Sequence, residues 1–379
     1  MNKIYKMQNL TFIGIGRLGL CSALVFEKVG YNVLGVDIFQ NYVDQLNKKI
    51  YKSHEPYIEE YLQNSKKFYA TTNLDKGLNF SDYIFIVVQT PNGGGENFYD
   101  HSILSSLLIN INKRKIKNKH FIICCTTMPG YIENIGKTLI EDCENCTINY
   151  NPEFIAQGNI IKDFENPDMI LIGQDNEKIG KKIEELYKPI FGDNQPKYCK
   201  LSLTEAELVK ISINGFITTK LSYANMISDA CDRLGGNKYK VLNAIGSDSR
   251  IGNKYFRPGN SFGGPCFPRD TQALSIVLEK LNLNNDLINS TRKYNDEHNK
   301  IMAENILLNL KEKNETTYIM EDVCYKENSE IPIIEESAKL KIAKYLVNKG
   351  IEIYIKDKKH MINEVKKEYG NKFKYIYKE

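Results

Sequence analysis

The sequence contains no tryptophan, and no apolar run approaches the ~20 residues that a membrane-spanning helix needs. The missing tryptophan accompanies a general bias toward Asn, Lys, Ile and Tyr and carries no functional meaning. The first ten residues include Lys3 and Lys6, but they contain no apolar signal core and no small-residue cleavage site. We therefore expect a soluble protein that is neither exported nor inserted into a membrane.

The chain also lacks the pattern of a disulfide framework or a metal cluster. Its nine cysteines are odd in number and scattered, which suits a reducing compartment. Cys143 and Cys146 have C-x-x-C spacing, but no second pair with matching spacing follows to complete a zinc site. We therefore expect a cytoplasmic protein that holds no metal.

A strong excess of one charge is absent as well. The chain has 51 Lys and Arg against 47 Asp and Glu, which gives a net charge of +4. Nucleic-acid binding normally requires a concentrated basic stripe, which this sequence does not show. Local basic groups are still available to bind a diphosphate.

What the sequence does contain is a repeated alternation of short apolar runs with helical patterns, which is typical of a parallel, doubly wound sheet. The runs are Leu10–Ile13, Asn32–Val36, Tyr83–Val88, Phe121–Cys125 and Thr147–Tyr150, with Ile170–Gly173 as an extension. A second, shorter alternation is expected near the end, with strands at Thr317–Met320, Ile351–Ile355 and Tyr375–Tyr377 and a helix at Glu336–Lys349.

Between the two alternations, Ser202 to about Leu234 has no Pro and carries apolar residues at helical spacing. A continuous helix there would span roughly 45 Å. A second helical region is expected from Thr271 to about Leu310. The predicted fold is α/β, with two Rossmann-like parallel-sheet domains joined by a long central helix and a helical middle region. The expected domains are residues 1–200, 201–310 and 311–379.

The first apolar run leads into Gly14-Ile15-Gly16-Arg17-Leu18-Gly19, a G-x-G-x-x-G turn that opens a helix. The first Gly allows the tight turn, the second lets a pyrophosphate approach the backbone, and the third permits close packing. The next strand ends at Asp37, whose carboxylate can bind an adenosine ribose and would repel a 2′-phosphate. The turn alone would fit any strand-to-helix connection, but together these features predict NAD as the cofactor.

Cys266 lies in Ser261-Phe262-Gly263-Gly264-Pro265-Cys266-Phe267-Pro268-Arg269-Asp270, just ahead of a probable helix. The field at a helix N-terminus favours a thiolate, and the two glycines let the backbone crowd a ligand. A single Cys is ordinarily a small buried apolar residue. In this segment the pattern favours a nucleophile instead.

Several motifs in this order resemble the UDP-glucose/GDP-mannose dehydrogenase family, from about Leu10 to about Lys356. Besides the Gly-rich turn and the Cys266 segment, they are Val88-Gln89-Thr90-Pro91, Thr126-Thr127-Met128-Pro129, Asn151-Pro152-Glu153-Phe154, Lys210 with Asn214, and Arg250-Ile251-Gly252-Asn253-Lys254. The resemblance implies a four-electron, NAD-dependent oxidation at C6 of a nucleotide sugar. Cys266 would add to the aldehyde, and water would hydrolyse the later thioester.

Within the family, the Cys266 and Glu153 segments look most like the UDP-glucose branch, with UDP-N-acetylhexosamine and GDP-mannose as alternatives. The resemblance also gives the domains their roles. Residues 1–200 would bind NAD, 201–310 would carry the cysteine loop, and 311–379 would bind the nucleotide sugar.

Lys210 and Asn214 are four residues apart and would share one face of a helix. The resemblance implies that Lys210 stabilises negative charge on the C6 oxygen and that Asn214 donates a hydrogen bond beside it. Asn151 and the proline after it look like a helix start, which would place Glu153 where the dipole keeps it anionic. The resemblance makes Glu153 the candidate general base for thioester hydrolysis, with Thr127 and Asp270 holding the water.

The other implied contacts divide between cofactor and substrate. The cofactor set is Gly14, Ile15, Gly16, Arg17, Leu18, Gly19, Asp37, Thr90, Pro91, Thr127, Gln157 and Arg269. The substrate set is Glu153, Phe154, Gln157, Lys210, Asn214, Arg250, Arg257, Phe262, Gly263 and Lys326. Guanidinium groups suit phosphate and sugar oxygens, although exposed cations can also serve solubility alone.

Three positions depart from the family pattern. Gln157 stands where a second Glu is common, so it cannot act as a base. Arg269 stands where Lys is usual, which keeps the charge. Glu335 lies where an Arg often faces the cofactor, so the charge there is reversed.

Two other classes of protein stay open. A hydroxyacid dehydrogenase that transfers a single hydride would not need Cys266. A non-catalytic NAD- or sugar-nucleotide-binding protein would not need this set of residues together: Cys266, Lys210, Asn214, Glu153 and Asp270. For an enzyme of the family, a homodimer through the long Ser202–Leu234 helix is implied.

Overall fold

The structure is a computed structural model that describes residues 8–91, 98–326, 329 and 331–378. Lys3 and Lys6, on which the expectation about export rests, lie outside the described residues. The chain divides into two compact units, residues 1–210 and 211–379. The boundary falls within helix α8 (Leu203–Arg233).

The first unit contains an eight-stranded sheet in the order β3-β2-β1-β4-β5-β6-β7-β8. The strands are β1 (Asn9–Ile13), β2 (Asn32–Val36), β3 (Phe68–Thr71), β4 (Tyr83–Ile86), β5 (His120–Ile123), β6 (Thr147–Tyr150), β7 (Met169–Gly173) and β8 (Lys197–Leu201). All neighbours are parallel except β6 and β7. The predicted doubly wound sheet is confirmed. Sequence analysis missed β3 and β8, because these edge strands are half exposed and lack a continuous apolar run.

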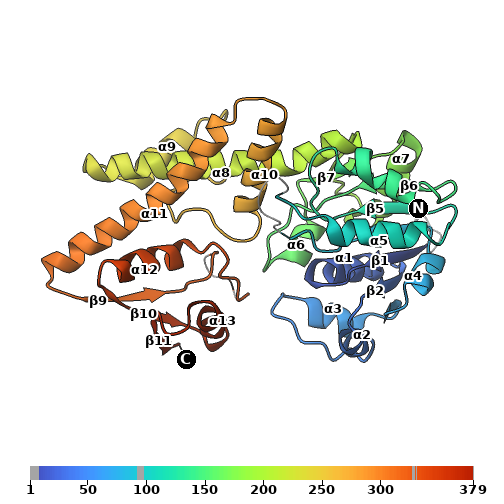
Figure 1. Ribbon diagram of the computed structural model, residues 1–379, viewed down its shortest axis with the longest axis horizontal. Coiled ribbons are helices and arrows are strands. Elements are labelled where there is room, and N and C mark those ends of the chain that lie inside the picture. Colours follow the sequence, from blue (N-terminus) through green and yellow to red (C-terminus); the bar gives the residue numbers. More distant parts are fainter. Residues whose placement is uncertain (1–7, 92–97, 327–328, 330, 379) are drawn as a thin grey trace. The chain divides into compact units, whose positions relative to one another are not determined.

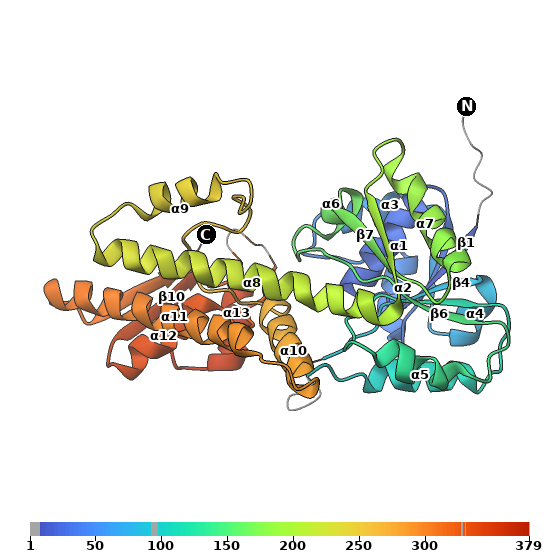
Figure 2. The ribbon, with the colours of Figure 1, turned by 90° about the horizontal axis from the view of Figure 1, so that it is seen from above.

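Helices cover both faces of this sheet. They are α1 (Arg17–Lys28), α2 (Gln40–Asn47), α3 (Ile58–Asn64), α4 (Leu74–Phe80), α5 (Ser102–Asn112), α6 (Ile160–Glu165) and α7 (Glu177–Phe191). Because side chains alternate along a strand, Leu10 and Phe12 of β1 pack with α1, α3, α6 and α7, whereas Ile13 packs with α4 and α5. Figure 2 shows α5 on one side of the strands and α6 and α7 on the other.

The second unit begins with the rest of α8, followed by α9 (Lys238–Gly246), α10 (Phe267–Lys280) and α11 (Asp286–Glu312). A three-stranded parallel sheet follows, in the order β11-β10-β9. Its elements are β9 (Thr317–Glu321), α12 (Ala338–Asn348), β10 (Glu352–Asp357), α13 (Lys359–Tyr369) and β11 (Lys374–Tyr377). Figure 1 shows α12 lying between α11 and the strands.

The predicted two sheets, long helix and helical middle region are confirmed. The helical region expected from Thr271 is two helices, because Asn282 adopts the left-handed conformation (φ +56°) just after α10. Ser202 caps α8, because its side-chain oxygen accepts the Glu205 N–H over 3.4 Å while its own N–H donates to the Glu205 carboxylate over 2.8 Å. Among the described residues, no helix has the length and apolar character needed to cross a membrane.

Candidate active site

The Gly-rich turn between β1 and α1 has the backbone that its glycines require. Gly14 adopts φ +86°, and its N–H donates to the Val36 carbonyl over 2.8 Å. A Cβ on Gly19 would lie 2.1 Å from the Gly14 carbonyl oxygen, so packing closes that position. A Cβ on Gly16 would meet no heavy atom within 4 Å. The turn therefore leaves space for a pyrophosphate at Gly16, which fits NAD.

The structure brings two other predicted cofactor residues together. The Arg17 guanidinium, in the first turn of α1, donates to the Gln157 side-chain oxygen. Asp37 follows β2, and its carboxylate accepts a hydrogen bond of 3.2 Å from the Phe39 N–H. Of the other members, Ile15 and Leu18 lie within the Gly-rich turn, and Thr90 and Pro91 lie shortly after β4. Thr127 follows β5, and Arg269 lies in α10.

Glu153 lies in an irregular segment, so the helix start predicted at this position is wrong. The next helix begins only at Ile160, and the Asn151 side chain does not cap a helix but accepts a hydrogen bond of 2.5 Å from the Tyr187 hydroxyl. A helix dipole therefore does not keep the Glu153 carboxylate anionic. Burial instead raises the pKa of Glu153 to about 7, against the opposing effects of Lys210 and Tyr187.

Lys210 contacts the same segment from α8. Its ammonium donates a hydrogen bond of 2.7 Å to the main-chain oxygen of Glu153 and lies 4.7 Å from the centre of the Phe154 ring. Three of the residues predicted to act on the substrate therefore meet in the first unit. An ammonium has three N–H donors, so two remain available for other oxygens.

Thr127 is completely buried, and its hydroxyl donates to the Glu207 carboxylate over 2.7 Å. Glu207 also accepts the main-chain N–H groups of Gly130 and Ile132 at 2.7 and 3.1 Å. Burial raises the pKa of Glu207 to about 7, although these hydrogen bonds act in the opposite direction. Sequence analysis did not assign Glu207 to the site.

A signal for this burial was present in the sequence. Glu207 falls in one helical register with Leu203, Ala206 and Ile211, all of which are buried in α8. A carboxylate on the apolar face of a helix needs buried donors. Here the donors come from residues 127–132.

In the second unit, Cys266 is the N-cap residue of α10, which agrees with the position predicted for it just ahead of a helix. The residue is exposed. Asp270, in the first turn of α10, is 1% exposed. Its carboxylate accepts a hydrogen bond of 2.5 Å from the Asn214 amide of α8. The structure therefore brings Asn214 and Asp270 together, one turn beyond the thiol.

Glu335 contacts the chain on both sides of Cys266, at Gly264 before it and at Arg269 in the first turn of α10. Its main-chain oxygen accepts the Gly264 N–H over 3.0 Å, and its carboxylate accepts the Arg269 guanidinium over 2.8 Å. The next residue also presses on the cysteine loop, because a Cβ on Gly263 would lie 2.1 Å from the Glu336 carbonyl oxygen. The reversed charge at Glu335 thus has a partner within the chain, namely the arginine that replaces the usual lysine.

The predicted substrate cations lie near the surface. The Arg250 side chain is 87% exposed and pairs with Asp248, with nitrogen-to-oxygen distances of 3.0 and 2.6 Å. Arg257 is exposed and Lys326 is half-buried, whereas Phe262 is buried beside Gly263. These positions suit either a polar ligand or solvent.

Comparison with known proteins decides the family. Models of the UDP-glucose/GDP-mannose dehydrogenase family match residues 8–191 as the NAD-binding domain and residues 204–297 as the central domain. A UDP-glucose 6-dehydrogenase of Rickettsia conorii is 30% identical over 356 residues, which are 92% of this chain and 80% of that protein. The chain belongs to the UDP-glucose/GDP-mannose dehydrogenase family.

Solved structures agree with this membership. A UDP-glucose dehydrogenase from Pyrobaculum islandicum gives a TM-score of 0.87 at 25% identity and covers 100% of this chain and 88% of its own. A GDP-mannose dehydrogenase from Pseudomonas aeruginosa gives 0.59 at 25% identity, with 95% and 84% covered. The protein is therefore an NAD-dependent nucleotide-sugar dehydrogenase. The names of these neighbours differ in the sugar, so family membership alone leaves the substrate open.

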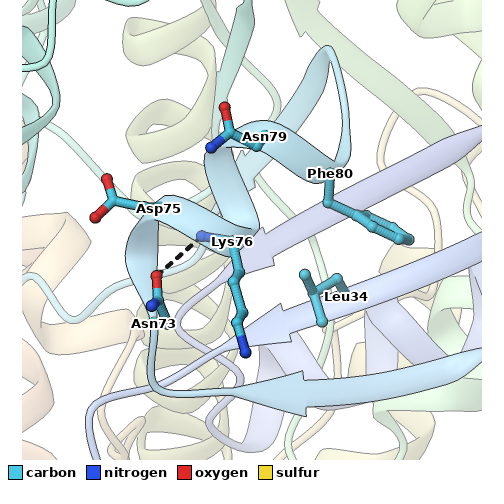
Figure 3. Close-up of a pocket in the computed structure, with 6 residues that line it drawn as sticks. All are labelled: Leu34, Asn73, Asp75, Lys76, Asn79 and Phe80. Carbon is cyan, nitrogen blue, oxygen red and sulfur yellow. Dashed lines mark hydrogen bonds between the residues drawn. The ribbon is translucent and has the colours of Figure 1, made fainter.

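One surface hollow of this dehydrogenase lies apart from the predicted site residues. Figure 3 shows it beside β2 and α4, where the Asn73 side chain caps α4 by accepting the Lys76 N–H over 3.0 Å. It has a volume of about 520 Å³ and is lined by Leu34, Asn73, Asp75, Lys76, Asn79 and Phe80. We assign it no part in the reaction.

Proposed function

We propose that this protein oxidises the C6 alcohol of UDP-glucose to a carboxylate in two NAD-dependent steps, with a covalent bond to Cys266 between them. The observation that carries the proposal is the exposed thiol at the N-cap of α10 in a chain of this family. An alcohol dehydrogenase that stops at the aldehyde has no need of such a nucleophile. UDP-glucose is favoured because the relatives from Rickettsia conorii and Pyrobaculum islandicum carry that activity in their names.

The Gly-rich turn and Asp37 would hold NAD, which supplies the hydride acceptor for both oxidations when it is bound. In the first step the C6 alcohol gives its hydride to the bound NAD and its hydroxyl proton to solvent, and becomes an aldehyde. The free N–H donors of Lys210 stabilise the negative charge that develops on the C6 oxygen. Asn214 adds a hydrogen bond to the same oxygen.

In the second step the Cys266 sulfur forms a bond to the aldehyde carbon, and the thiol proton passes to the oxygen. The thiohemiacetal then gives a hydride to a second NAD and its hydroxyl proton to solvent, which leaves a thioester. Holding the aldehyde on sulfur also prevents its release before the second oxidation.

Hydrolysis returns the enzyme to its starting state. Water adds to the thioester carbon, the carbon–sulfur bond breaks, and Cys266 recovers its proton. Glu153 accepts a proton from the water, a task suited to a carboxyl whose pKa burial raises to about 7. We assign Asp270, oriented by Asn214, to hold that water. The Thr127 hydroxyl donates its one proton to Glu207, so it could meet that water only as an acceptor.

A substrate panel tests the choice of sugar. The purified protein would be supplied with NAD and with UDP-glucose, UDP-N-acetylglucosamine, UDP-N-acetylmannosamine or GDP-mannose in turn. UDP-glucose is expected to give the highest kcat/KM. A higher value for another sugar would overturn the substrate while leaving the chemistry in place, whereas no turnover of any nucleotide sugar would overturn both.

We also propose a homodimer that forms through α8. Phe216, Tyr223 and Met226 are 69%, 48% and 39% exposed, and their spacing places them on one side of the helix. Apolar groups gathered in this way commonly mark an interface. Light scattering is expected to show a dimer, which Phe216→Glu should dissociate. A wild-type monomer would contradict the proposal.

A further inference from the structure

His298 is buried between two hydrogen-bond acceptors in the second unit. It lies in α11 and is 4% exposed. Its Nδ1 is 2.7 Å from a carboxylate oxygen of Asp229 in α8, and its Nε2 is 2.9 Å from the main-chain oxygen of Gly259. The same oxygen of Asp229 also accepts the Tyr294 hydroxyl over 2.7 Å.

This arrangement fixes the proton on Nε2. A carbonyl oxygen can only accept a hydrogen bond, so Nε2 must carry a proton and donate it to the Gly259 oxygen. The other ring nitrogen, Nδ1, faces the carboxylate oxygen of Asp229 that also accepts the Tyr294 hydroxyl. The His298 ring therefore connects Asp229 of α8 to the Gly259 peptide.

The carbonyl group that His298 binds belongs to the segment ahead of the cysteine loop. The N–H of Gly259 donates to the Asn225 side chain over 3.2 Å, so both of its polar groups are held. Asn295 of α11 then binds both the N–H and the carbonyl of Phe262, at 2.8 and 3.0 Å. Residues 259–262 are therefore attached to α8 and α11 by buried polar side chains.

This segment connects residues to which the reaction has been assigned. Arg257 precedes it, and Phe262 and Gly263, from the predicted substrate set, lie at its end. Cys266 follows three residues later. Any rotation of the Gly259 peptide would therefore move a predicted phosphate-binding side chain relative to the thiol.

We propose that His298 is a positioning residue whose Nε2–H fixes the Gly259 peptide and with it the predicted substrate-binding segment 257–263. The expected effect on substrate binding rests on the proposed function. The hydrogen bond to Gly259 and the order of residues 257–263 can be tested without substrate.

Two substitutions separate the halves of the ring. His298→Gln can place an amide N–H near the position of Nε2 and keep the bond to Gly259, but it loses the donor to Asp229. His298→Asn can place one near Nδ1 and keep the bond to Asp229, but it cannot reach Gly259. Both variants lose the ring and one of its two hydrogen bonds, so both should be less stable. His120→Gln, at a half-buried histidine of the first unit, is the matched control.

The first readout is the protonation of the wild-type ring. The chain has five histidines, so ¹⁵N-histidine labelling gives few signals, and the loss of one in the His298 variants assigns it. We expect the Nε2 nitrogen of His298 to carry a proton at pH 7.5. A non-protonated Nε2 there overturns the hydrogen bond to Gly259.

The second readout is local order without substrate, from hydrogen–deuterium exchange of peptides covering residues 257–263. Exchange should be faster in His298→Asn than in His298→Gln, while the control matches the wild type. Equal exchange in the two variants overturns the positioning role. If neither variant folds, Asn225→Ala, which frees the Gly259 N–H instead, should speed exchange in the same segment, and unchanged exchange there overturns the role.

The third readout is kinetic. His298→Asn should raise the KM for the nucleotide sugar by about tenfold over His298→Gln, with the KM for NAD changed by less than about twofold, because misplaced contacts cost binding of one substrate only. A rise in both KM values would indicate general destabilisation and contradict the proposal. If the wild type oxidises no nucleotide sugar, the proposed function fails, while the labelling and exchange results still decide the role of His298.

Discussion

The Lys210 ammonium donates a hydrogen bond of 2.7 Å to the main-chain oxygen of Glu153. A group suited to stabilising an oxyanion is thus fixed to the main chain of Glu153, a half-buried residue. Burial raises the pKa of the Glu153 carboxyl to about 7, and the charge of Lys210 opposes the rise. The contact joins the two roles that the proposed oxidation and hydrolysis require.

The rate of thioester hydrolysis should therefore rise with pH through about 7, because Glu153 can accept a proton only after losing its own. The folded pKa lies above the ordinary value, so the active form is present above about 7 and lost below it. Rapid-quench measurement of acyl-enzyme decay across pH 5.5 to 9 checks this.

In Glu153→Gln the acyl-enzyme should decay slowly at every pH, and the pH dependence should be lost. Glu207 titrates in the same range, so Glu207→Gln is the control and should keep the midpoint. If the pH midpoint of decay changed in Glu207→Gln and stayed the same in Glu153→Gln, the general base would be Glu207, which would contradict the proposal.

Two glycines of the cofactor turn should respond differently to alanine. A Cβ at position 19 would lie 2.1 Å from the Gly14 carbonyl oxygen, whereas one at position 16 meets no atom within 4 Å. Gly19→Ala should lower the free energy of unfolding by about 1–3 kcal/mol or more. Gly16→Ala should fold normally but raise the KM for NAD by about tenfold or more, because the pyrophosphate can no longer approach.

Urea denaturation and the KM for NAD separate these effects. Equal loss of stability in both variants would show that the space over Gly16 is filled in solution.

The ion pair between Arg269 and Glu335 should affect stability mainly by keeping two like charges from meeting at this point. The two side chains are 25% and 43% exposed, so Glu335→Gln should cost about 0–1 kcal/mol of stability. Glu335→Arg should cost more, because it places two guanidinium groups together, and Arg269→Glu in the same chain should recover most of the loss. Denaturation of the two single variants and the double variant measures the coupling, and additive effects would show that the side chains do not interact.

Local patterns in the sequence predicted much of the fold and part of the site. The strand, the glycines from Gly14 to Gly19, and Asp37 belong to one strand–helix–strand unit, in which each position follows from the one before it. The position of Cys266 just ahead of a helix was likewise predicted from the residues around it. In each case the pattern lies within one continuous segment of the chain.

Contacts between distant residues could not be predicted in this way. The Asn151-Pro152 pair has the local signature of a helix start, but the Asn151 side chain bonds to Tyr187, 36 residues away. Glu335 and Arg269 are 66 residues apart, and each alone is only a departure from a family pattern. Burial of Glu153 and Glu207, which sets their pKa values, likewise depends on the folded core.

Replacing Cys266 with serine separates the two oxidations. The variant keeps the shape of the side chain but loses the sulfur nucleophile, so uronate formation should fall by at least about a thousandfold. Cys324→Ser, at a half-buried thiol of the same unit, should keep wild-type turnover. Mass spectrometry of the products checks both, and full activity of Cys266→Ser would favour an enzyme that transfers a single hydride.

The most direct measurement is the number of NADH molecules formed for each uronate released by the wild-type enzyme. Absorbance gives the NADH, and chromatography of the same quenched sample gives the carboxylate. The four-electron route through Cys266 predicts two NADH for each UDP-glucuronate, with no free aldehyde. One NADH for each product molecule, with the aldehyde released, would contradict it.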